Sequence, residues 1–159
     1  PDIKLLMIGS AGFGGNVVTP YVQEVQKLVE KAGERVKFTG YIENQKLYRY
    51  YQSADIQVIP SLWEEAAGLI AIEGMLSGLP LIITKSGGMI EYAPSNVAVW
   101  IDRDNIIPNL EAAITQLADD KEKRKEMSEL SLERAKEFPK KKFYEDYIEV
   151  FEYERIGER

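Results

Sequence analysis

Residues 56–84 read IQVIPSLWEEAAGLIAIEGMLSGLPLIIT, and this stretch already specifies one complete structural unit. The apolar run at residues 56–59 stops at a proline, which lacks the N–H that a strand ladder needs, so a strand is expected there. Residues 69–76 are apolar at all but two positions and precede Gly78, which favours a mostly buried helix with a glycine beyond its end. A second strand is expected at residues 81–83. Because strands joined through a helix run parallel, the stretch predicts a strand-helix-strand unit.

The same alternation of short apolar runs and helical spacing continues on both sides of this unit. Further strands are expected at residues 3–8, 36–39 and 97–101, and helices at residues 22–29 and 47–54. After residue 105 the sequence predicts only helices, at residues 106–117, 119–138 and 140 to about 156. The predicted fold class is therefore α/β, with an open parallel sheet, helices on both of its faces and a helical C-terminal segment.

Composition excludes several classes of protein. The chain has 159 residues, 45% of them hydrophobic, which is enough apolar material for one globular domain over residues 1–159. It contains no Cys and no His, so disulfides, Cys or His zinc sites, thiolate nucleophiles and imidazole-based triads are excluded. Its net charge is −6 and its basic residues form no cluster, so nucleic acid is not an expected partner.

The two ends of the chain and its hydropathy bear on where the protein works. No apolar stretch approaches the roughly 18 residues that a membrane span requires. The sequence starts at Pro1, with neither an initiator Met nor a secretory signal pattern. We therefore expect a cytoplasmic protein, and we expect Pro1 to have been internal to a longer chain.

Ligands of open parallel sheets bind beyond the carboxyl ends of the strands, so the turns after the strands are the candidate sites. The first turn, GSAGFGG, begins at Gly9, and its glycines let backbone amides approach a ligand closely. It does not fit the dinucleotide pattern G-x-G-x-x-G, and the next strand ends in Thr39 rather than in the acidic residue that holds a ribose. These departures disfavour a nicotinamide cofactor, and a nicotinamide-dependent oxidoreductase stays an alternative.

The second turn leads into the apolar helix and is the most informative. Gly68 can open this helix with no side chain in the way, which leaves its own amide and those of Leu69 and Ile70 unpaired. With the helix dipole, these amides form a site that suits a phosphate or a diphosphate. Glu65 on the rim of the loop and Glu73 in the helix can reach opposite ends of a bound molecule and accept sugar hydroxyls.

A purely structural explanation of these two carboxylates is the alternative. Glu65 is then a residue that favours a helix start, and Glu73 is then a solvated residue of the helix. For Glu73 this explanation is the weaker one, because its apolar neighbours indicate a buried helix, in which an ionised group needs a partner.

The third turn carries Gly87, Gly88 and Glu91. Paired glycines at a strand end either let a ligand approach closely or form an ordinary turn, and the sequence favours neither. Glu91 either bonds a sugar hydroxyl or favours the start of a helix. The turn is therefore a candidate binding site with a structural alternative.

These residues together resemble a known family, the C-terminal, nucleotide-sugar-binding domain of glycosyltransferases with the GT-B fold, most like the retaining family 4. The resemblance rests on Pro60-Ser61, on the E-x7-E spacing of Glu65 and Glu73, on residues 74–80 and on the Gly87-Gly88…Glu91 loop. It extends upstream through residues 5–9, 40–42 and 54–55. Three features depart from the family: Gly74 stands for a common Ala, Ala66-Ala67 for a small residue and an aromatic one, and an Arg and a Lys that usually precede the position of Pro1 are absent.

The resemblance implies a role for each matching residue. Glu73 is expected to hold the ribose hydroxyls of the donor, and Glu65, at the catalytic position, is expected to contact hydroxyls of the transferred sugar. The other implied contacts are the amides of Gly68, Leu69 and Ile70 with the diphosphate, the turn at Tyr41 and Ile42 with the base, and the Gly9 loop with the cleft between two domains.

The expected function follows from the same resemblance. The chain is expected to be the Rossmann-like donor half of a GT-B enzyme, with the N-terminal acceptor domain and the first strand-helix unit outside residues 1–159. It would bind a nucleoside diphosphate sugar, with UDP as the expected nucleotide, for retaining transfer of a hexosyl group to an acceptor hydroxyl in cell-surface polysaccharide assembly. No metal and no cofactor are expected, and the fragment is expected to be inactive alone.

The expected partners are the nucleotide sugar and, through the N-terminal domain, an acceptor glycan or lipid-linked saccharide. The whole enzyme is expected to associate peripherally with the inner face of the membrane. Besides the oxidoreductase, two alternatives stay open: a sugar-nucleotide epimerase of the same fold, and a non-catalytic α/β scaffold domain.

Overall fold

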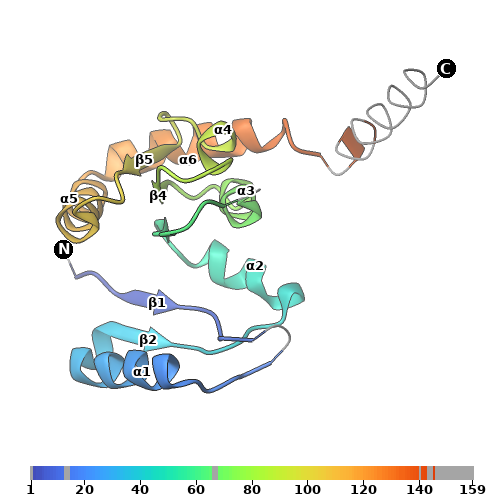
Figure 1. Cartoon of the computed structure of the whole chain (residues 1–159). Helices are drawn as coiled ribbons and strands as arrows, with labels where there is room; N and C mark the ends of the chain where they lie inside the picture. Colours follow the sequence, from blue (N-terminus) through green and yellow to red (C-terminus); the bar gives the residue numbers. More distant parts are fainter. Residues whose placement is uncertain (1, 13–14, 66–67, 140, 143–144, 146–159) are drawn as a thin grey trace. The chain divides into compact units, whose positions relative to one another are not determined.

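The computed structural model describes residues 2–12, 15–65, 68–139, 141–142 and 145. The chain forms two compact units, residues 1–53 and residues 54–159, and each unit alternates parallel strands with helices (Figure 1). This architecture confirms the predicted α/β class.

In the first unit, β1 (Leu5–Met7) pairs in parallel with β2 (Val36–Phe38), and α1 (Pro20–Ala32) connects them and packs against β2. Helix α1 begins after Thr19, whose side-chain oxygen accepts the N–H of Val22 at 3.2 Å. An N-cap oxygen of this kind satisfies one of the amides that a helix start leaves unpaired. The sequence therefore fixes the start of α1 through a threonine followed by a proline.

The end of α1 is set by Gly33, which has the positive φ of 65° that glycine adopts without strain. A short 3-10 helix, η1 (Gly33–Arg35), leads into β2, and α2 (Asn44–Gln52) completes the described part of this unit. Among these residues only Val22 is buried, so the first unit has a small core.

In the second unit, β3 (Gln57–Ile59), β4 (Leu81–Thr84) and β5 (Ala98–Ile101) form a parallel sheet with β4 in the middle. The register places Ile82 of β4 opposite Val58 and Val99. All four residues of β4 are buried, as expected of a strand with neighbours on both edges and helices on both faces.

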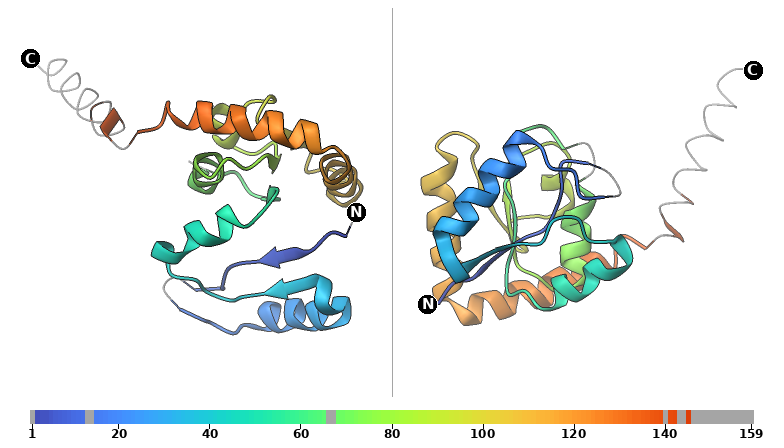
Figure 2. Two further views of the ribbon diagram at one scale, coloured as in Figure 1. Left: turned by 180° about the vertical axis from the view of Figure 1, so that it is seen from behind. Right: turned by 90° about the horizontal axis from the view of Figure 1, so that it is seen from below.

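Four helices accompany this sheet: α3 (Leu69–Leu76), α4 (Met89–Tyr92), α5 (Ile106–Asp119) and α6 (Lys121–Ala135). Helix α3 lies between β3 and β4 in the chain, and α4 lies between β4 and β5. Helix α6 lies next to both α3 and α5, as Figure 2 shows.

Strand β4 directs its side chains alternately toward two apolar layers. Ile82 belongs to a buried cluster that joins β4 and β5 to α5 and α6, with members Ile101, Ala113, Leu117 and Met127. Leu81 faces the other layer, where its side chain lies against the backbone position of Gly74 in α3. Helices therefore cover both faces of this sheet, as predicted.

Helix α6 is joined to the rest of the second unit by a buried polar contact as well. Ser131 is fully buried, and its hydroxyl donates to the carbonyl oxygen of Leu79 at 3.0 Å. Met127 and Ala135 are buried on the same helix, so α6 packs through a narrow apolar stripe.

Most of the predicted elements are present within a few residues of their expected bounds, and one expectation is corrected. Helix α3 is not mostly buried: Ala71, Gly74 and Met75 are buried, whereas Leu69, Ile70 and Leu76 are 63%, 44% and 59% exposed. The short helices η1 and α4 were not predicted, because three or four residues carry no periodicity.

Part of the predicted C-terminal helix, residues 140 to about 156, lies outside the described residues. Within the described ranges, no helix combines the length and the apolar character that crossing a membrane requires.

Candidate functional site

Three loops of the second unit follow the carboxyl ends of its strands, where ligands of parallel sheets bind. We call them the β3 loop (residues 60–65), the β4 loop (residues 85–88) and the β5 loop (residues 102–105). The hydroxyl of buried Thr84, at the end of β4, donates to the carbonyl of Ser61 at 2.7 Å. The hydroxyl of buried Ser86 donates to the carbonyl of Trp63. Two buried hydroxyls thus hold the β3 loop against the end of β4.

Glu65, the residue expected at the catalytic position, lies half-buried in this arrangement. Its backbone N–H donates to Ser86 Oγ at 3.2 Å, and its carbonyl oxygen accepts the N–H of Gly88 at 3.0 Å. Its side-chain Oε1 accepts the hydroxyl of Ser61 at 2.7 Å. Both backbone groups and one carboxylate oxygen of Glu65 are therefore held by the protein. Oε2 accepts no hydrogen bond from the described residues.

Glu64, the neighbouring residue, makes contacts that the sequence did not reveal. Its Oε2 accepts the N–H of Gly87 at 2.6 Å, and its Oε1 forms an ion pair with the guanidinium of Arg103. Both partners hold the pKa of Glu64 below its usual value, and Arg103 has a larger effect than the Gly87 amide. Glu64, Gly87 and Arg103 are called the Glu64 clasp below, because together they join all three loops.

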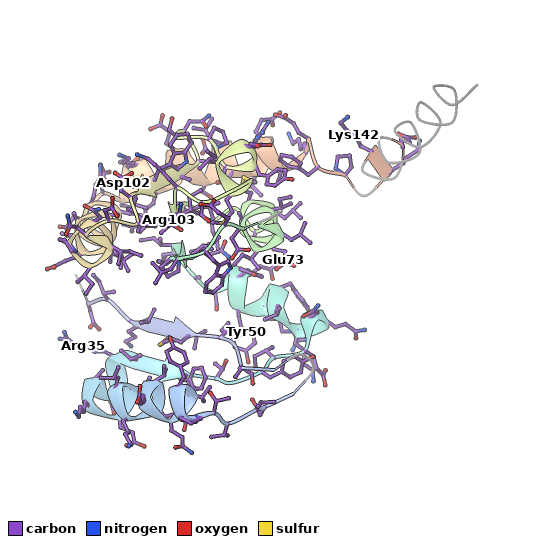
Figure 3. The ribbon with its side chains drawn as sticks, viewed as in Figure 1. Arg35, Tyr50, Glu73, Asp102, Arg103 and Lys142 are labelled. Atoms are coloured by element: carbon purple, nitrogen blue, oxygen red, sulfur yellow. The ribbon has the colours of Figure 1, made fainter. Side chains whose placement is uncertain are left out.

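One signal in the sequence points to the clasp. Arg103 follows the last strand by two residues, and the carboxyl ends of parallel strands share one edge of the sheet. A basic residue at that edge therefore has the acidic β3 loop within its reach. Asp102 and Arg103 lie together on the β5 loop (Figure 3), and Asp102 pairs at 2.9 Å with Lys85 of the β4 loop.

The predicted glycine pair of the β4 loop comes together with Glu65. Gly87 has a positive φ of 47°, and a β-carbon there would overlap the carbonyl group of Glu65. The amides of Gly87 and Gly88 donate to Glu64 and Glu65, respectively. The glycine at position 87 is therefore required by the close approach of two loops, and a ligand contact of the pair stays a prediction.

The start of α3 has the geometry that the anion-site prediction needs. Gly68 is buried, precedes the helix and has a left-handed φ of 54°, and its carbonyl accepts the N–H of Ala71 at 2.8 Å. An α-helix supplies no internal partner for its first amides, here those of Leu69 and Ile70. A β-carbon on Gly68 would overlap Met89, so the helix start also depends on glycine for packing. The predicted differences at Ala66-Ala67 lie outside the described residues.

The structure places Glu73 on the exposed side of α3 (Figure 3), which corrects the expectation that it is buried. The reason is that α3 buries only the side formed by Ala71, Gly74 and Met75. Glu91 is exposed too and lies in the first turn of α4, and its carbonyl accepts a hydrogen bond from Arg134 at 2.8 Å. Ligand contacts of both carboxylates stay predictions.

In the first unit, the Gly9 loop meets the turn that contains Tyr41. The N–H of Gly9 donates to the carbonyl of Gly40 at 3.0 Å, and the N–H of Tyr41 donates to Asn16 Oδ1 at 2.7 Å. Tyr41 and Ile42 are both half-buried. The structure thus brings Gly9 and Tyr41 into one local cluster, and the amide of Tyr41 is already bound to protein.

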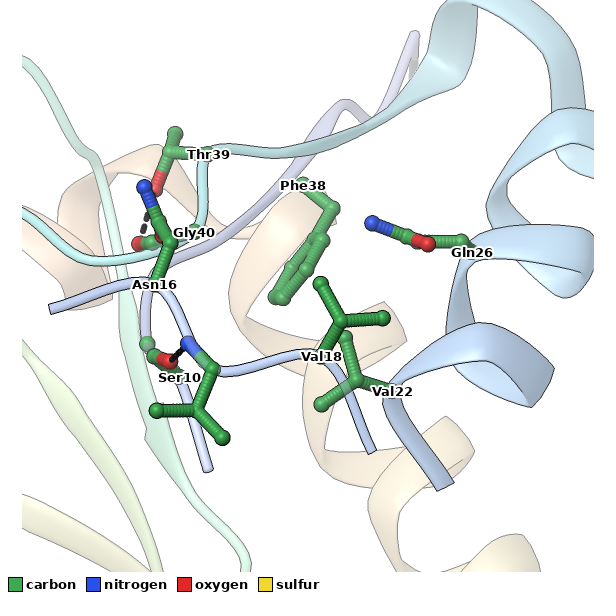
Figure 4. Close-up of a pocket in the computed structure, with 10 residues that line it drawn as sticks. Ser10, Asn16, Val18, Val22, Gln26, Phe38, Thr39 and Gly40 are labelled. Atoms are coloured by element: carbon green, nitrogen blue, oxygen red, sulfur yellow. Dashed lines mark hydrogen bonds between the residues drawn. The ribbon is translucent and has the colours of Figure 1, made fainter. Parts of the chain in front are cut away.

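A pocket of about 210 Å³ lies beside this cluster (Figure 4). Ser10, Asn16 and Thr39 give it polar groups, whereas Val18, Val22 and Phe38 give it an apolar side. Ser10 Oγ accepts the N–H of Val17 at 2.9 Å, which shapes the loop at its edge. The pocket contains Gly9 but neither Tyr41 nor Ile42.

No metal site is formed by the described residues, which contain no group of three or more Asp and Glu side chains able to hold an ion. The expected independence from metals and cofactors is not tested by this observation and stays a prediction.

Comparison with known proteins gives the family context of this geometry. A sequence model of the family described as "Glycosyl transferases group 1" matches residues 1–134. Spore coat protein SA of Bacillus subtilis (strain 168) is 29% identical over 157 residues, which cover 98% of this chain and 42% of that protein. The chain thus spans less than half the length of this curated relative.

Two solved structures have a similar fold. Sucrose-phosphate synthase from Thermosynechococcus elongatus has a TM-score of 0.78 at 25% identity, over 94% of this chain and 39% of that one. Anabaena Alr3699/HepE, in complex with UDP and glucose, has a TM-score of 0.82 at 22% identity, over 96% of this chain and 41% of that one. Both likenesses agree with the Rossmann-like arrangement of parallel strands and helices described above.

Proposed function

The chain belongs to the glycosyl transferases group 1 family, and on that premise we propose that it is the donor-binding part of a retaining glycosyltransferase that uses a nucleoside diphosphate sugar. The observation that carries the proposal is the position of Glu65. It is held half-buried at the carboxyl end of a parallel sheet, three residues before the glycine that opens α3. A carboxylate beside a helix start suits a ligand that has sugar hydroxyls next to a diphosphate.

The proposed reaction breaks the bond between the anomeric carbon of the sugar and an oxygen of the diphosphate. A new bond forms between that carbon and the hydroxyl oxygen of the acceptor, which gives up its proton to the departing diphosphate, and the configuration at the carbon is retained. Negative charge builds up on the departing diphosphate. The amides of Gly68, Leu69 and Ile70, with the dipole of α3, are fixed donors that stabilise this charge without a metal.

Two carboxylates have distinct parts in this proposal. Glu65 accepts hydroxyls of the transferred sugar through its Oε2, because Ser61 already occupies Oε1. Glu73 accepts the ribose hydroxyls from the exposed side of α3. The turn at Tyr41 and Ile42 contacts the base, and the Gly9 loop lines the donor site.

The finer features of the proposal concern the substrates. We take UDP as the nucleotide, because Anabaena Alr3699/HepE has a similar fold and is in complex with UDP and glucose. The transferred group is a hexosyl, and the acceptor is a hydroxyl of a glycan or lipid-linked saccharide in cell-surface polysaccharide assembly. Acceptor binding is assigned to the longer protein, in keeping with the share of its relatives that this chain spans, and so is a cytoplasmic position at the inner face of the membrane.

Titration calorimetry of the purified chain with UDP and GDP tests the proposal. We expect weak binding of UDP and a loss of about tenfold in affinity for Glu73→Gln, since a hydrogen bond to a charged group contributes about 1.5–3 kcal/mol. Glu111→Gln is the matched control, because it also removes one exposed carboxylate from the second unit, on α5. Equal UDP affinity of the wild type and Glu73→Gln contradicts the ribose contact, and absence of nucleotide binding to the wild type contradicts the proposal itself.

A further inference from the structure

The Glu64 clasp is the only described connection in which one side chain reaches all three loops at the carboxyl end of the second sheet. Glu64 lies on the β3 loop, takes an amide from Gly87 of the β4 loop and pairs with Arg103 of the β5 loop. The guanidinium of Arg103 also lies 3.5 Å from the carbonyl of Leu62, back on the β3 loop. Arg103 thus contacts the β3 loop at two positions, Leu62 and Glu64, of which the second is next to Glu65 in the chain.

We propose that Glu64 and Arg103 are positioning residues that fix Glu65 for contact with the donor sugar. This inference rests on the proposed function of Glu65 and deepens it. In this scheme neither residue touches the sugar: both carboxylate oxygens of Glu64 bind protein groups, and the guanidinium of Arg103 binds Glu64 and the carbonyl of Leu62. Their effect passes through the backbone that Glu64 and Glu65 share.

The geometry explains why the loop needs this support. Glu64 and Glu65 are consecutive, and both are bound to the β4 loop: Glu64 through its side chain and Glu65 through its backbone. Gly87 lies against the backbone of Glu65 in a left-handed conformation, and its amide is fixed by the Glu64 carboxylate. Loss of the clasp therefore frees Gly87 to move, and the Gly88 N–H that holds the Glu65 carbonyl moves with it.

Solvent exposure makes a purely stabilising role a poor explanation of the clasp. The side chains of Arg103 and Glu64 are 37% and 63% exposed, and exposed ion pairs contribute little to stability. A positioning role predicts a different pattern, in which sugar binding changes and stability does not. A second ion pair, Lys85 with Asp102, joins the β4 loop to the β5 loop without involving the β3 loop and therefore provides a control.

The test measures dissociation constants for UDP and UDP-glucose on the wild type, Glu64→Gln, Arg103→Gln, the double variant and Asp102→Asn. We expect Glu64→Gln and Arg103→Gln each to weaken UDP-glucose binding by roughly five- to tenfold, with UDP affinity and Tm unchanged. The double variant is expected to lose no more than either single variant, because both remove one shared interaction. Asp102→Asn is expected to match the wild type for both ligands.

A fall in UDP and UDP-glucose affinity by the same factor, or unchanged UDP-glucose affinity, overturns the positioning role. Amide hydrogen exchange separates this outcome from failure of the proposed function. In Glu64→Gln we expect the Glu65 and Gly88 amides to exchange about tenfold faster than in the wild type, with or without ligand. If the wild type binds no nucleotide but the Glu65 and Gly88 amides still exchange faster in Glu64→Gln, the donor-site proposal is wrong and the clasp holds these amides. If the Glu65 and Gly88 amides exchange at the same rate in Glu64→Gln and in the wild type, the positioning role is refuted, whether or not the chain binds a nucleotide.

Discussion

Gly87 approaches Glu65 so closely that a β-carbon at residue 87 would occupy the place of the Glu65 carbonyl oxygen. The two residues belong to different loops, 22 positions apart in the chain (87 minus 65), and the approach brings the Gly88 amide to within 3.0 Å of that carbonyl. The β3 and β4 loops therefore fit together only with glycine at position 87.

Replacement of Gly87 by Ala is expected to destabilise the protein by about 1–3 kcal/mol, because a left-handed φ strains an L-residue and the methyl group meets backbone that cannot rotate away. Urea unfolding followed by circular dichroism measures the change. Gly15→Ala is the control, since a β-carbon there meets nothing within 4 Å. Equal stability of the two variants contradicts the close approach.

Gly74 and Gln57 are expected to show strong energetic coupling. A β-carbon at residue 74 would overlap Gln57 Oε1, an atom that is buried and has no hydrogen-bond partner among the described residues. Gly74→Ala is thus expected to cost about 1–3 kcal/mol by overpacking in the wild-type background. In a Gln57→Ala background the same change is expected to cost nothing or to stabilise α3, because Ala is the better helix former.

A double-mutant cycle with urea unfolding measures this coupling. Additive effects of the two substitutions would show that Gln57 does not occupy the space beside α3. The coupling also gives a physical reason for the glycine at a position where the resembling family commonly has Ala: here Gln57 fills that space and donates to the carbonyl of Ile70 at 3.0 Å.

Ser131→Ala is expected to lower the free energy of unfolding by about 1–3 kcal/mol, the cost of leaving the buried Leu79 carbonyl without its donor. Chemical denaturation measures this difference. Ser95→Ala is a suitable comparison, because Ser95 is exposed. If both variants are as stable as the wild type, water or another donor replaces the hydroxyl, and α6 does not depend on this contact.

Acid should weaken the Glu64 clasp selectively. The pKa of Glu64 is lowered from 4.5 by Arg103 and then by the Gly87 amide, so the charged form that the clasp needs is fully present above pH 4.5 and is lost as the pH falls through the lowered value. At each pH, the ratio of the Gly88 amide exchange rates in Glu64→Gln and in the wild type is therefore expected to stay constant from about pH 7 to about pH 5 and to shrink toward about pH 3.

The chemical shift of the Gly87 amide proton, measured by NMR as a function of pH, reports the titration of Glu64 directly. In the wild type it is expected to shift in one step below pH 4.5, and in Glu64→Gln this step is expected to be absent. A Gly87 shift that follows the same curve in both proteins would mean that another carboxyl group causes it.

The alternation of apolar runs with helical spacing was enough to predict the strands and the longer helices. Local signals also located ends of elements, such as Pro60 after β3 and Gly78 beyond the end of α3. Burial was harder to predict: the composition of α3 indicates a buried helix, but its Leu69 and Leu76 are exposed because only one side of the helix packs on β4 and α6. Apolar content alone does not tell which face of a helix finds a neighbour.

For the candidate site, the sequence identified the turns at Glu65 and at Gly87-Gly88 as candidates but did not predict how they are joined. Glu65, Gly87 and Gly88 were all predicted, and the structure brings them together. Glu64 and Arg103 were missed as a pair, because their contact depends on loops 39 residues apart whose proximity follows from strand order alone. The predicted buried position of Glu73 was wrong for the reason that applies to α3 as a whole.

Strand β1 also affects how the purified chain must be handled. Within the first unit it pairs on one side only, with β2, and Leu5 and Leu6 are 47% and 40% exposed. An edge strand with unpaired backbone N–H and C=O groups and exposed apolar side chains can pair with another extended segment, from a second copy or from an unfolded chain. Self-association that grows with protein concentration follows, so dilute samples and a check of particle size belong with every affinity measurement on this chain.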